Sequence, residues 1–182
     1  MPEFFLELFS EEIPAGLQKN LREKIFEDFK NLFDERSIKS KKSFCLSSPN
    51  RVVIVFESLD KQIQIKPEEI RGPKIGASDQ ALEGFIRSNK IEKKDLYKKK
   101  TERDEFYFFK TESKILKTQD LLTEFIPKIL GNYQWKKSMK WGEFDLNWGR
   151  PLKSILSIFD KKMLNFKFHH LISSNTTFID KD

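Results

Sequence analysis

Two patterns of apolar residues open the chain and predict a strand followed by a helix. Apolar positions alternate with polar ones from Glu3 to Phe9 (EFFLELF), as in a half-buried strand, and residues 10–14 (SEEIP) interrupt the pattern. After this break, apolar residues recur at helical spacing on one face, at Leu17, Leu21, Ile25, Phe29, Leu32 and Phe33. Ser10 is expected to cap this helix, and Pro14 suits its first turn.

The middle of the chain contains several short segments with the composition of strands. Residues 44–46 and 51–59 are rich in apolar side chains, and the turn-forming sequence at 47–50 (SSPN) predicts two strands joined by a turn. The run Arg51 to Phe56 (RVVIVF) is nearly unbroken, which favours a central strand. Residues 62–66 and 106–110 are predicted as further strands.

Loops and helices are predicted between and after these strands. Gly and Pro punctuate residues 71–76 (RGPKIG), which indicates a loop, and Ser78 is expected to cap a short helix that buries Leu82 and Phe85. A second short helix near residues 93–98 is an open alternative. Residues 118–130 predict a longer helix, whose end Pro127 weakens.

The last quarter changes character and predicts a separate β-rich part. Residues 136–142 (KKSMKWG) are basic, and residues 152–159 and 163–168 flank Asp160-Lys161-Lys162 in the manner of a β-hairpin. The predicted fold class is therefore α+β, with a mixed or antiparallel sheet covered by two or more helices and a C-terminal β-hairpin subdomain. We expect residues 1–135 to form an N-terminal α+β body and residues 136–182 the truncated start of a following β-rich subdomain.

Composition excludes some classes of protein. Hydrophobic residues make up 38% of the 182 positions, which is too apolar for a disordered chain. The longest apolar runs, such as Val52 to Phe56, are too short to cross a bilayer, and the single cysteine, Cys45, cannot form an intramolecular disulfide. We therefore expect a cytoplasmic protein without a membrane partner.

The formal net charge of +6 comes from the part of the chain after residue 38. Residues 1–38 hold five Lys and Arg against nine Asp and Glu, whereas residues 39–135 hold twenty against fourteen and residues 136–182 nine against five. A basic surface with interspersed aromatic residues suits a nucleic-acid backbone, although the same pattern also describes a solvated face.

Signatures of nucleotide, metal and nucleophile chemistry are missing from the sequence. Its seven glycines form neither GxGxxG nor GxxxxGK[ST], and Cys45 has no identifiable base. His169 and His170 would point to opposite faces of a strand, so no metal site is predicted there. Trp135 and Trp141 lie beside lysines and either pack in the core, which we favour, or stack on RNA bases.

Several short segments, taken in order, resemble the N-terminal part of the beta subunit of bacterial glycyl-tRNA synthetase. The segments span nearly the whole chain: 10–15 (SEEIPA), 48–51 (SPNR), 71–73 (RGP), 81–88 (ALEGFIRS), 138–142 (SMKWG), 150–151 (RP) and 174–177 (SNTT). Two positions and one segment depart from the family pattern: Asn50 stands where the family has an arginine, Ser154 replaces an aromatic residue, and residues 178–182 replace a Gly-His-Arg-Phe-like segment. Because the family's beta subunits are several times longer, we expect the chain to be a fragment rather than a divergent short form.

The resemblance implies a function. It indicates a class II aminoacyl-tRNA synthetase of two alpha and two beta subunits, in which the alpha subunit uses ATP, Mg²⁺ and glycine and this chain carries neither a cofactor nor a catalytic residue. The partners implied are the alpha subunit and tRNA-Gly. The residues expected to contact tRNA or the alpha subunit lie on family-like segments: Arg51, Arg71, Lys74, Arg87, Lys140 and Arg150. Two alternatives stay open, namely structural ion pairs at these positions and a scaffold that mediates only subunit assembly.

Overall fold

The computed structural model describes residues 1–65, 67–101 and 104–179, and its residues form two compact units. The first unit combines residues 1–63 with residues 116–182, and the second consists of residues 64–115. The boundary expected at residue 136 coincides with neither end of the second unit, which begins at residue 64 and ends at residue 115. The strand that follows residue 136 belongs to the first unit.

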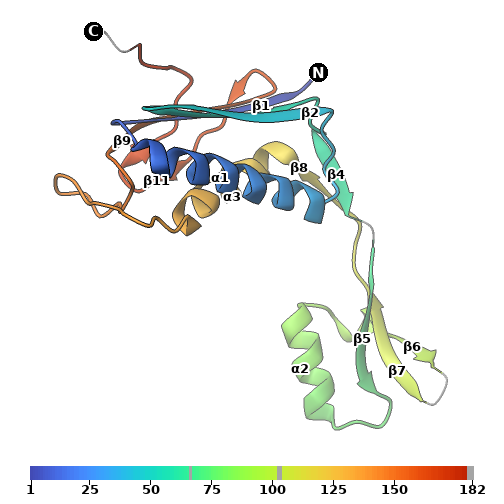
Figure 1. Cartoon of the computed structure of the whole chain (residues 1–182). Coiled ribbons are helices and arrows are strands. Elements are labelled where there is room, and N and C mark those ends of the chain that lie inside the picture. Colours follow the sequence, from blue (N-terminus) through green and yellow to red (C-terminus); the bar gives the residue numbers. More distant parts are fainter. Residues whose placement is uncertain (66, 102–103, 180–182) are drawn as a thin grey trace. The chain divides into compact units, whose positions relative to one another are not determined.

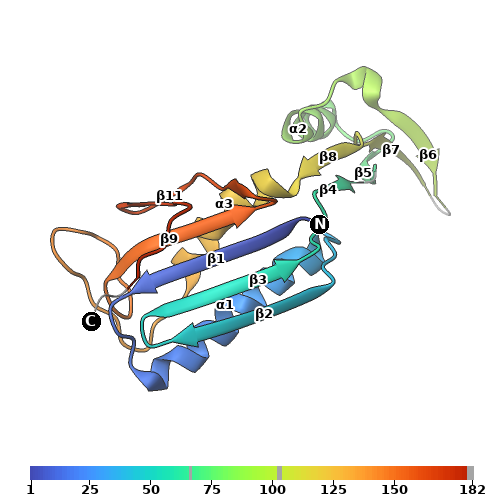
Figure 2. The same ribbon diagram turned by 90° about the horizontal axis from the view of Figure 1, so that it is seen from above.

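A five-stranded antiparallel sheet forms the centre of the first unit (Figure 2), in the strand order β10-β9-β1-β3-β2. Its strands are β1 (Glu3–Ser10), β2 (Lys42–Ser48), β3 (Arg51–Glu57), β9 (Leu152–Phe159) and β10 (Lys162–Met163). Strand β1 pairs on one side with β3 and on the other with β9, which comes from the far end of the sequence. Strands β9 and β10 are joined through Asp160 and Lys161, both of which have positive φ.

Two helices, α1 (Ala15–Glu35) and α3 (Thr118–Asn132), lie on one face of this sheet (Figure 1). Alternation along β1 turns Phe4, Leu6 and Leu8 into the core that these helices cover. All but the first of the apolar residues predicted for the α1 face are buried, and Leu17 is partly buried against the same core. The predicted strand and helix are therefore confirmed.

The predicted cap of α1 is wrong. Ser10 is the last residue of β1, and its hydroxyl donates a hydrogen bond of 2.8 Å to the carbonyl oxygen of Glu11. The helix begins after Pro14, which occupies the N-cap position without a side-chain hydrogen bond. The strand runs one residue further than expected because Ser10 pairs with Leu152 across a register shift.

The second unit is a three-stranded antiparallel sheet with one helix. Its strands lie in the order β5-β7-β6, and the elements are β5 (Glu69–Lys74), α2 (Asp79–Asn89), a 3₁₀ turn (Lys93–Asp95), β6 (Tyr97–Lys100) and β7 (Glu105–Lys110). Ser78 caps α2 as predicted, since its side chain accepts a hydrogen bond from the backbone of Ala81. A separate two-stranded sheet consists of β4 (Gln62–Ile65) and β8 (Lys114–Lys117), and the expected last residue of β4, Lys66, lies outside the described residues.

The loop predicted at residues 71–76 is also wrong, because Arg71 to Lys74 belong to β5. The pairing of β5 with β7 shifts register between Arg71 and Lys74, so the strand accommodates Gly72 and Pro73 in an irregular stretch. Only Gly76, with a φ of 92°, lies in the turn that follows. The fold class, α+β with antiparallel sheets and helices on a sheet face, is confirmed. A last pair of short strands, β11 (Lys167–Phe168) and β12 (Leu171–Ile172), completes the first unit.

Candidate functional site

Family-like segments that are far apart in sequence meet at one end of the main sheet. The backbone N–H of Ser10 donates to the carbonyl oxygen of Asn50 at 2.9 Å, and that of Glu11 donates to the carbonyl oxygen of Pro151 at 2.9 Å. We call this region, formed by residues 7–14, 48–51, 150–153 and 174–178, the motif end. Its construction explains why these segments occur together in one sequence, since each provides part of one hydrogen-bonded junction.

Arg51 is held inside the motif end by several contacts. Its Nη1 lies 2.9 Å from Oε1 of Glu7 and donates to the hydroxyl of Thr177 at 2.7 Å. The Thr177 hydroxyl in turn donates to Glu7 at 2.5 Å, and the guanidinium lies over the ring of Phe9 at 4.5 Å from its centroid. Glu7 is only 7% exposed. This geometry gives Arg51 a structural role, because its charge compensates a buried carboxylate.

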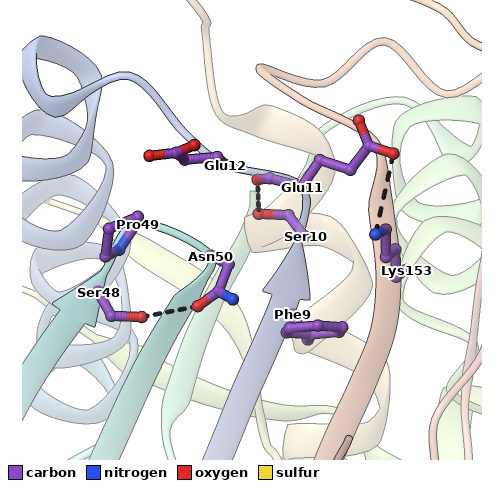
Figure 3. A pocket seen from close by; sticks show the side chains of 8 residues that line it. All are labelled: Phe9, Ser10, Glu11, Glu12, Ser48, Pro49, Asn50 and Lys153. Atoms are coloured by element: carbon purple, nitrogen blue, oxygen red, sulfur yellow. Dashed lines mark hydrogen bonds and ion pairs between the residues drawn. The ribbon is translucent and has the colours of Figure 1, made fainter. Parts of the chain in front are cut away.

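A shallow pocket of about 480 Å³ opens at the motif end (Figure 3). Oε1 of Glu11 lies 3.8 Å from Nζ of Lys153 at this pocket. The hydroxyl of Ser48 donates a hydrogen bond of 2.9 Å to Oδ1 of Asn50. Its eight lining residues include no histidine or cysteine. The two serine hydroxyls donate to neighbouring acceptors within their own turns, so neither is paired with a base that would activate it.

Arg150 belongs to the motif end, and Lys140 lies on the long loop between α3 and β9. Met139 and Trp148 form an isolated antiparallel bridge, and Nη1 of Arg150 lies 3.9 Å from the sulfur of Met139. Lys140 is exposed, and its one ion-pair partner among the described residues, Asp145 at 3.8 Å, is almost fully solvated. Such an exposed pair stabilises the fold very little, so Lys140 remains available to an anionic partner.

The other three predicted site residues belong to the second unit. The Arg71 guanidinium lies over the ring of Phe106, 3.5 Å from its centroid, and Lys74 forms an ion pair with Asp104. Arg87 is exposed on α2, and among the described residues its side chain has no hydrogen bond or ion pair. The structure thus places the six predicted cations in two groups of three, one in each unit.

The sequence prediction missed two residues that lie near Arg71 on the same sheet of the second unit, Tyr97 and Lys99. Tyr97 and Lys99 on β6 both contact Glu69, at 2.8 Å and 2.5 Å, and these hydrogen bonds lower the pKa of the Glu69 carboxyl. The Tyr97 ring stacks on that of Phe108 with centroids 6.3 Å apart. Neither 97–100 (YKKK) nor 105–110 (EFYFFK) shows a regular alternation, so the shared face follows only from the pairing of Tyr97 with Phe108 and of Lys99 with Phe106.

The tryptophans of the basic loop pack in the protein, as favoured from the sequence. Trp135 contacts Tyr133 and Trp148 edge to face, with centroids 4.8 and 5.0 Å apart. Trp141 packs against the core from a partly buried position. Their rings are therefore used in packing, whereas Lys136, Lys137 and Lys140 beside them are exposed.

Gly72 is required by a close approach of α2 to β5. A Cβ at position 72 would lie 2.7 Å from Cε1 of Phe85. We expect Gly72→Ala to destabilise the second unit by about 1–3 kcal/mol, because Phe85 packs edge to face on Phe109 and has little room to move. Hydrogen exchange measured by mass spectrometry should show faster exchange of the β5 and β7 amides.

Gly84 provides the matched control for this prediction. It lies within α2, and nothing lies within 4 Å of a Cβ built there. Gly84→Ala should therefore slow exchange in α2 slightly, since alanine is about 0.5–1 kcal/mol better than glycine inside a helix. Equal behaviour of the two variants would contradict the steric explanation.

The Cys45 thiol, possible metal ligands and possible membrane-spanning helices are the remaining features to consider among the described residues. Burial raises the pKa of the Cys45 thiol to about 12, so it stays protonated at neutral pH. No three His, Cys, Asp or Glu side chains of the described residues gather as metal ligands. Among the described helices, none has both the length and the apolar character that a bilayer span requires.

Comparison with known proteins gives a consistent result. The sequence profile described as glycyl-tRNA synthetase beta subunit matches residues 4–181. The chain is 39% identical over 176 residues to the glycine–tRNA ligase beta subunit of Rickettsia prowazekii, covering 97% of this chain and 26% of the relative. The corresponding proteins of Rickettsia conorii and Rickettsia canadensis are each 38% identical over 98% of this chain, and cover 27% and 26% of the relatives. The chain thus spans about a quarter of the length of these relatives.

Proposed function

Because the chain belongs to the glycyl-tRNA synthetase beta subunit family, we propose that it serves as the N-terminal part of the beta subunit of a tetrameric glycine–tRNA ligase. In this proposal it supports the ATP-dependent attachment of glycine to tRNA-Gly by binding tRNA, the alpha subunit, or both. The class II catalytic site, with ATP and Mg²⁺, lies on the alpha subunit, and the assembly works in the cytoplasm. These assignments rest on the family resemblance.

The observation that carries the tRNA-binding part is the distribution of ion pairs among the six predicted cations. Arg51 and Lys74 are paired with carboxylates, whereas Arg71, Arg87 and Arg150 have no ion pair among the described residues. A guanidinium without a carboxylate partner can bind a phosphate without first breaking an ion pair. The proposal therefore assigns the tRNA contacts to these three arginines, with Lys140 as a fourth cation.

Binding of tRNA-Gly to the assembled alpha and beta subunits at several salt concentrations tests this assignment. Replacing Arg71, Arg87 and Arg150 by Gln should weaken binding and reduce the slope of log K against log salt by about one for each lost phosphate contact. The charge-matched control replaces Lys24, Lys94 and Lys128, which form exposed pairs with nearby carboxylates, by Gln. Identical salt dependence of the two triple variants would contradict the assignment.

A specific feature also favours docking of the alpha subunit. On the sheet face opposite the helices, Leu46 lies across from Val53 and Phe44 from Val55, and the Leu46 side chain is 59% exposed. An exposed leucine in such an apolar row suits a protein partner. Leu46→Asp should reduce co-elution of the two subunits in size-exclusion chromatography, whereas Ile65→Asp, at an apolar site with 42% exposure in the other unit, should not.

A further inference from the structure

The two faces of the β5-β7-β6 sheet differ in what covers them. Alternation along β7 places Phe109 on the face where Phe85 of α2 packs against it, and Gly72 lets the helix approach. Phe106 and Phe108 therefore point to the other face. Figure 1 shows α2 on one side of this sheet only. We call the other side the helix-free face, since no helix among the described residues of the second unit covers it.

Strand register defines the residues of the helix-free face. Phe108 lies opposite Tyr97 on one side and Arg71 on the other, and Phe106 lies opposite Lys99 and Lys74. The remaining charged pair of this face, Glu69 and Lys110, lies opposite one another at the far end. The face therefore carries three aromatic rings at its centre with cations on β5, β6 and β7 around them.

Cations and the Tyr97 ring of this face lie on the rings of Phe106 and Phe108. The Arg71 guanidinium lies over Phe106, the Lys99 ammonium lies 5.5 Å from the centroid of Phe108, and Tyr97 stacks on Phe108. Tyr97 is 36% exposed while Phe108 is 8% exposed, so Tyr97 presents an outer ring supported by a buried one. Its hydroxyl is fixed by the 2.8 Å hydrogen bond to Glu69. A ring that is ordered in this way loses little entropy when a base stacks on it.

The charge of the face favours an anionic partner. Its four cations, Arg71, Lys74, Lys99 and Lys110, stand against two carboxylates, Glu69 and Asp104. Arg71 and Lys110 have no ion pair among the described residues. Packing alone accounts for the buried Phe108, but it does not require an exposed ring and an arginine without an ion pair on the same face.

We propose that the helix-free face binds unpaired RNA nucleotides, with Tyr97 stacking on a base and Arg71 and Lys110 contacting the flanking phosphates. The proposal rests on the tRNA-binding function proposed above and goes further by naming the structural class of RNA and the surface. An open sheet with exposed aromatic rings and basic edges suits single strands, because bases in a duplex cannot reach the rings. A protein partner is the alternative that the experiment must distinguish.

The test uses the assembled alpha and beta subunits with two synthetic probes, a single-stranded RNA decamer of uridine and a blunt RNA duplex with a similar number of phosphates. Tyr97→Ala should weaken binding of the decamer about tenfold, the effect expected from loss of one stacked base. Binding of the duplex should not change. Ultraviolet crosslinking of the decamer should label the peptide that contains Tyr97, and the label should disappear in the variant.

Matched variants separate stacking from charge and from misfolding. Tyr97→Phe keeps the ring and should bind the decamer within about twofold of the unaltered assembly. Arg71→Gln should reduce the salt dependence of decamer binding, whereas Lys98→Gln, on the same sheet but pointing to the other face, should not. Circular dichroism of Tyr97→Ala should match that of Tyr97→Phe.

Two results would overturn the inference. The first is that Tyr97→Ala binds and crosslinks the decamer as the unaltered assembly does. The second is that Tyr97→Ala no longer co-elutes with the alpha subunit while its RNA binding is unchanged, which would identify the face as a protein interface. With the first result, the assembly would still bind tRNA-Gly through other surfaces. A complete lack of salt-dependent tRNA binding would instead contradict the tRNA-binding part of the proposed function.

Discussion

Arg51→Ala should lower the free energy of unfolding of the first unit by about 3 kcal/mol. The substitution leaves the Glu7 carboxylate buried without its cation, and breaking one side of a buried pair is strongly destabilising. We take the lower end of the usual range because the Arg51 side chain is 23% exposed. Denaturant unfolding followed by tryptophan fluorescence measures the effect, since all three tryptophans belong to the same unit.

Replacing both partners provides the control for this prediction. Glu7→Leu with Arg51→Met removes the charges together, so its cost should be smaller than that of Arg51→Ala alone. Unchanged stability of Arg51→Ala combined with weaker tRNA binding would contradict the structural role and restore Arg51 as an RNA contact. The same pair of measurements therefore decides between the two interpretations of this residue.

Local patterns predicted most of the elements of the first unit correctly. Helix α1 follows from its apolar stripe, and β2 and β3 follow from two apolar runs around a turn. The pairing of β1 with β9 was not predictable in this way, since residues 4–10 and 152–159 are separated by most of the chain. Long-range pairing depends on packing that no single segment encodes.

The errors at Ser10 and at residues 71–76 have a common physical cause. Both segments have the residues of a cap or a turn, yet tertiary pairing extends a strand through them. Gly72 is needed for the approach of Phe85 and not for a positive φ. A glycine or a serine in the sequence indicates that the backbone is permissive, but only the neighbouring elements decide how that freedom is used.

The candidate site was predictable in parts. Arg71 and Arg87 were selected on family-like segments, and the structure leaves both without an ion pair among the described residues. Arg51 was selected for the same reason, and it is held by a buried carboxylate that lies 44 positions earlier in the sequence. The burial of Glu7, the carboxylate that binds Arg51, separates these cases, and burial is a property of the folded chain. Position within a motif alone therefore does not distinguish a binding arginine from a structural one.

Gly149→Ala should destabilise the first unit by about 2–3 kcal/mol, because a Cβ at this buried position would overlap the six-membered ring of Trp135. The ring has little freedom to move, since it is packed edge to face between Tyr133 and Trp148. Tryptophan fluorescence during denaturant unfolding measures the loss of stability, and a changed emission spectrum before unfolding would report displacement of Trp135.

A double-mutant cycle makes this prediction specific. In a Trp135→Leu background the obstructing ring is gone, so adding Gly149→Ala should cost much less than it does in the unaltered chain. Gly16→Ala is the control for a general effect of alanine, since nothing lies within 4 Å of a Cβ at that helix position. Equal costs of Gly149→Ala in the two backgrounds would contradict the clash. Rescue by Trp135→Leu would establish that position 149 requires glycine because the Trp135 ring packs against it. The packing of Trp135 with Tyr133 and Trp148 would then be what holds the loop before Arg150 in place.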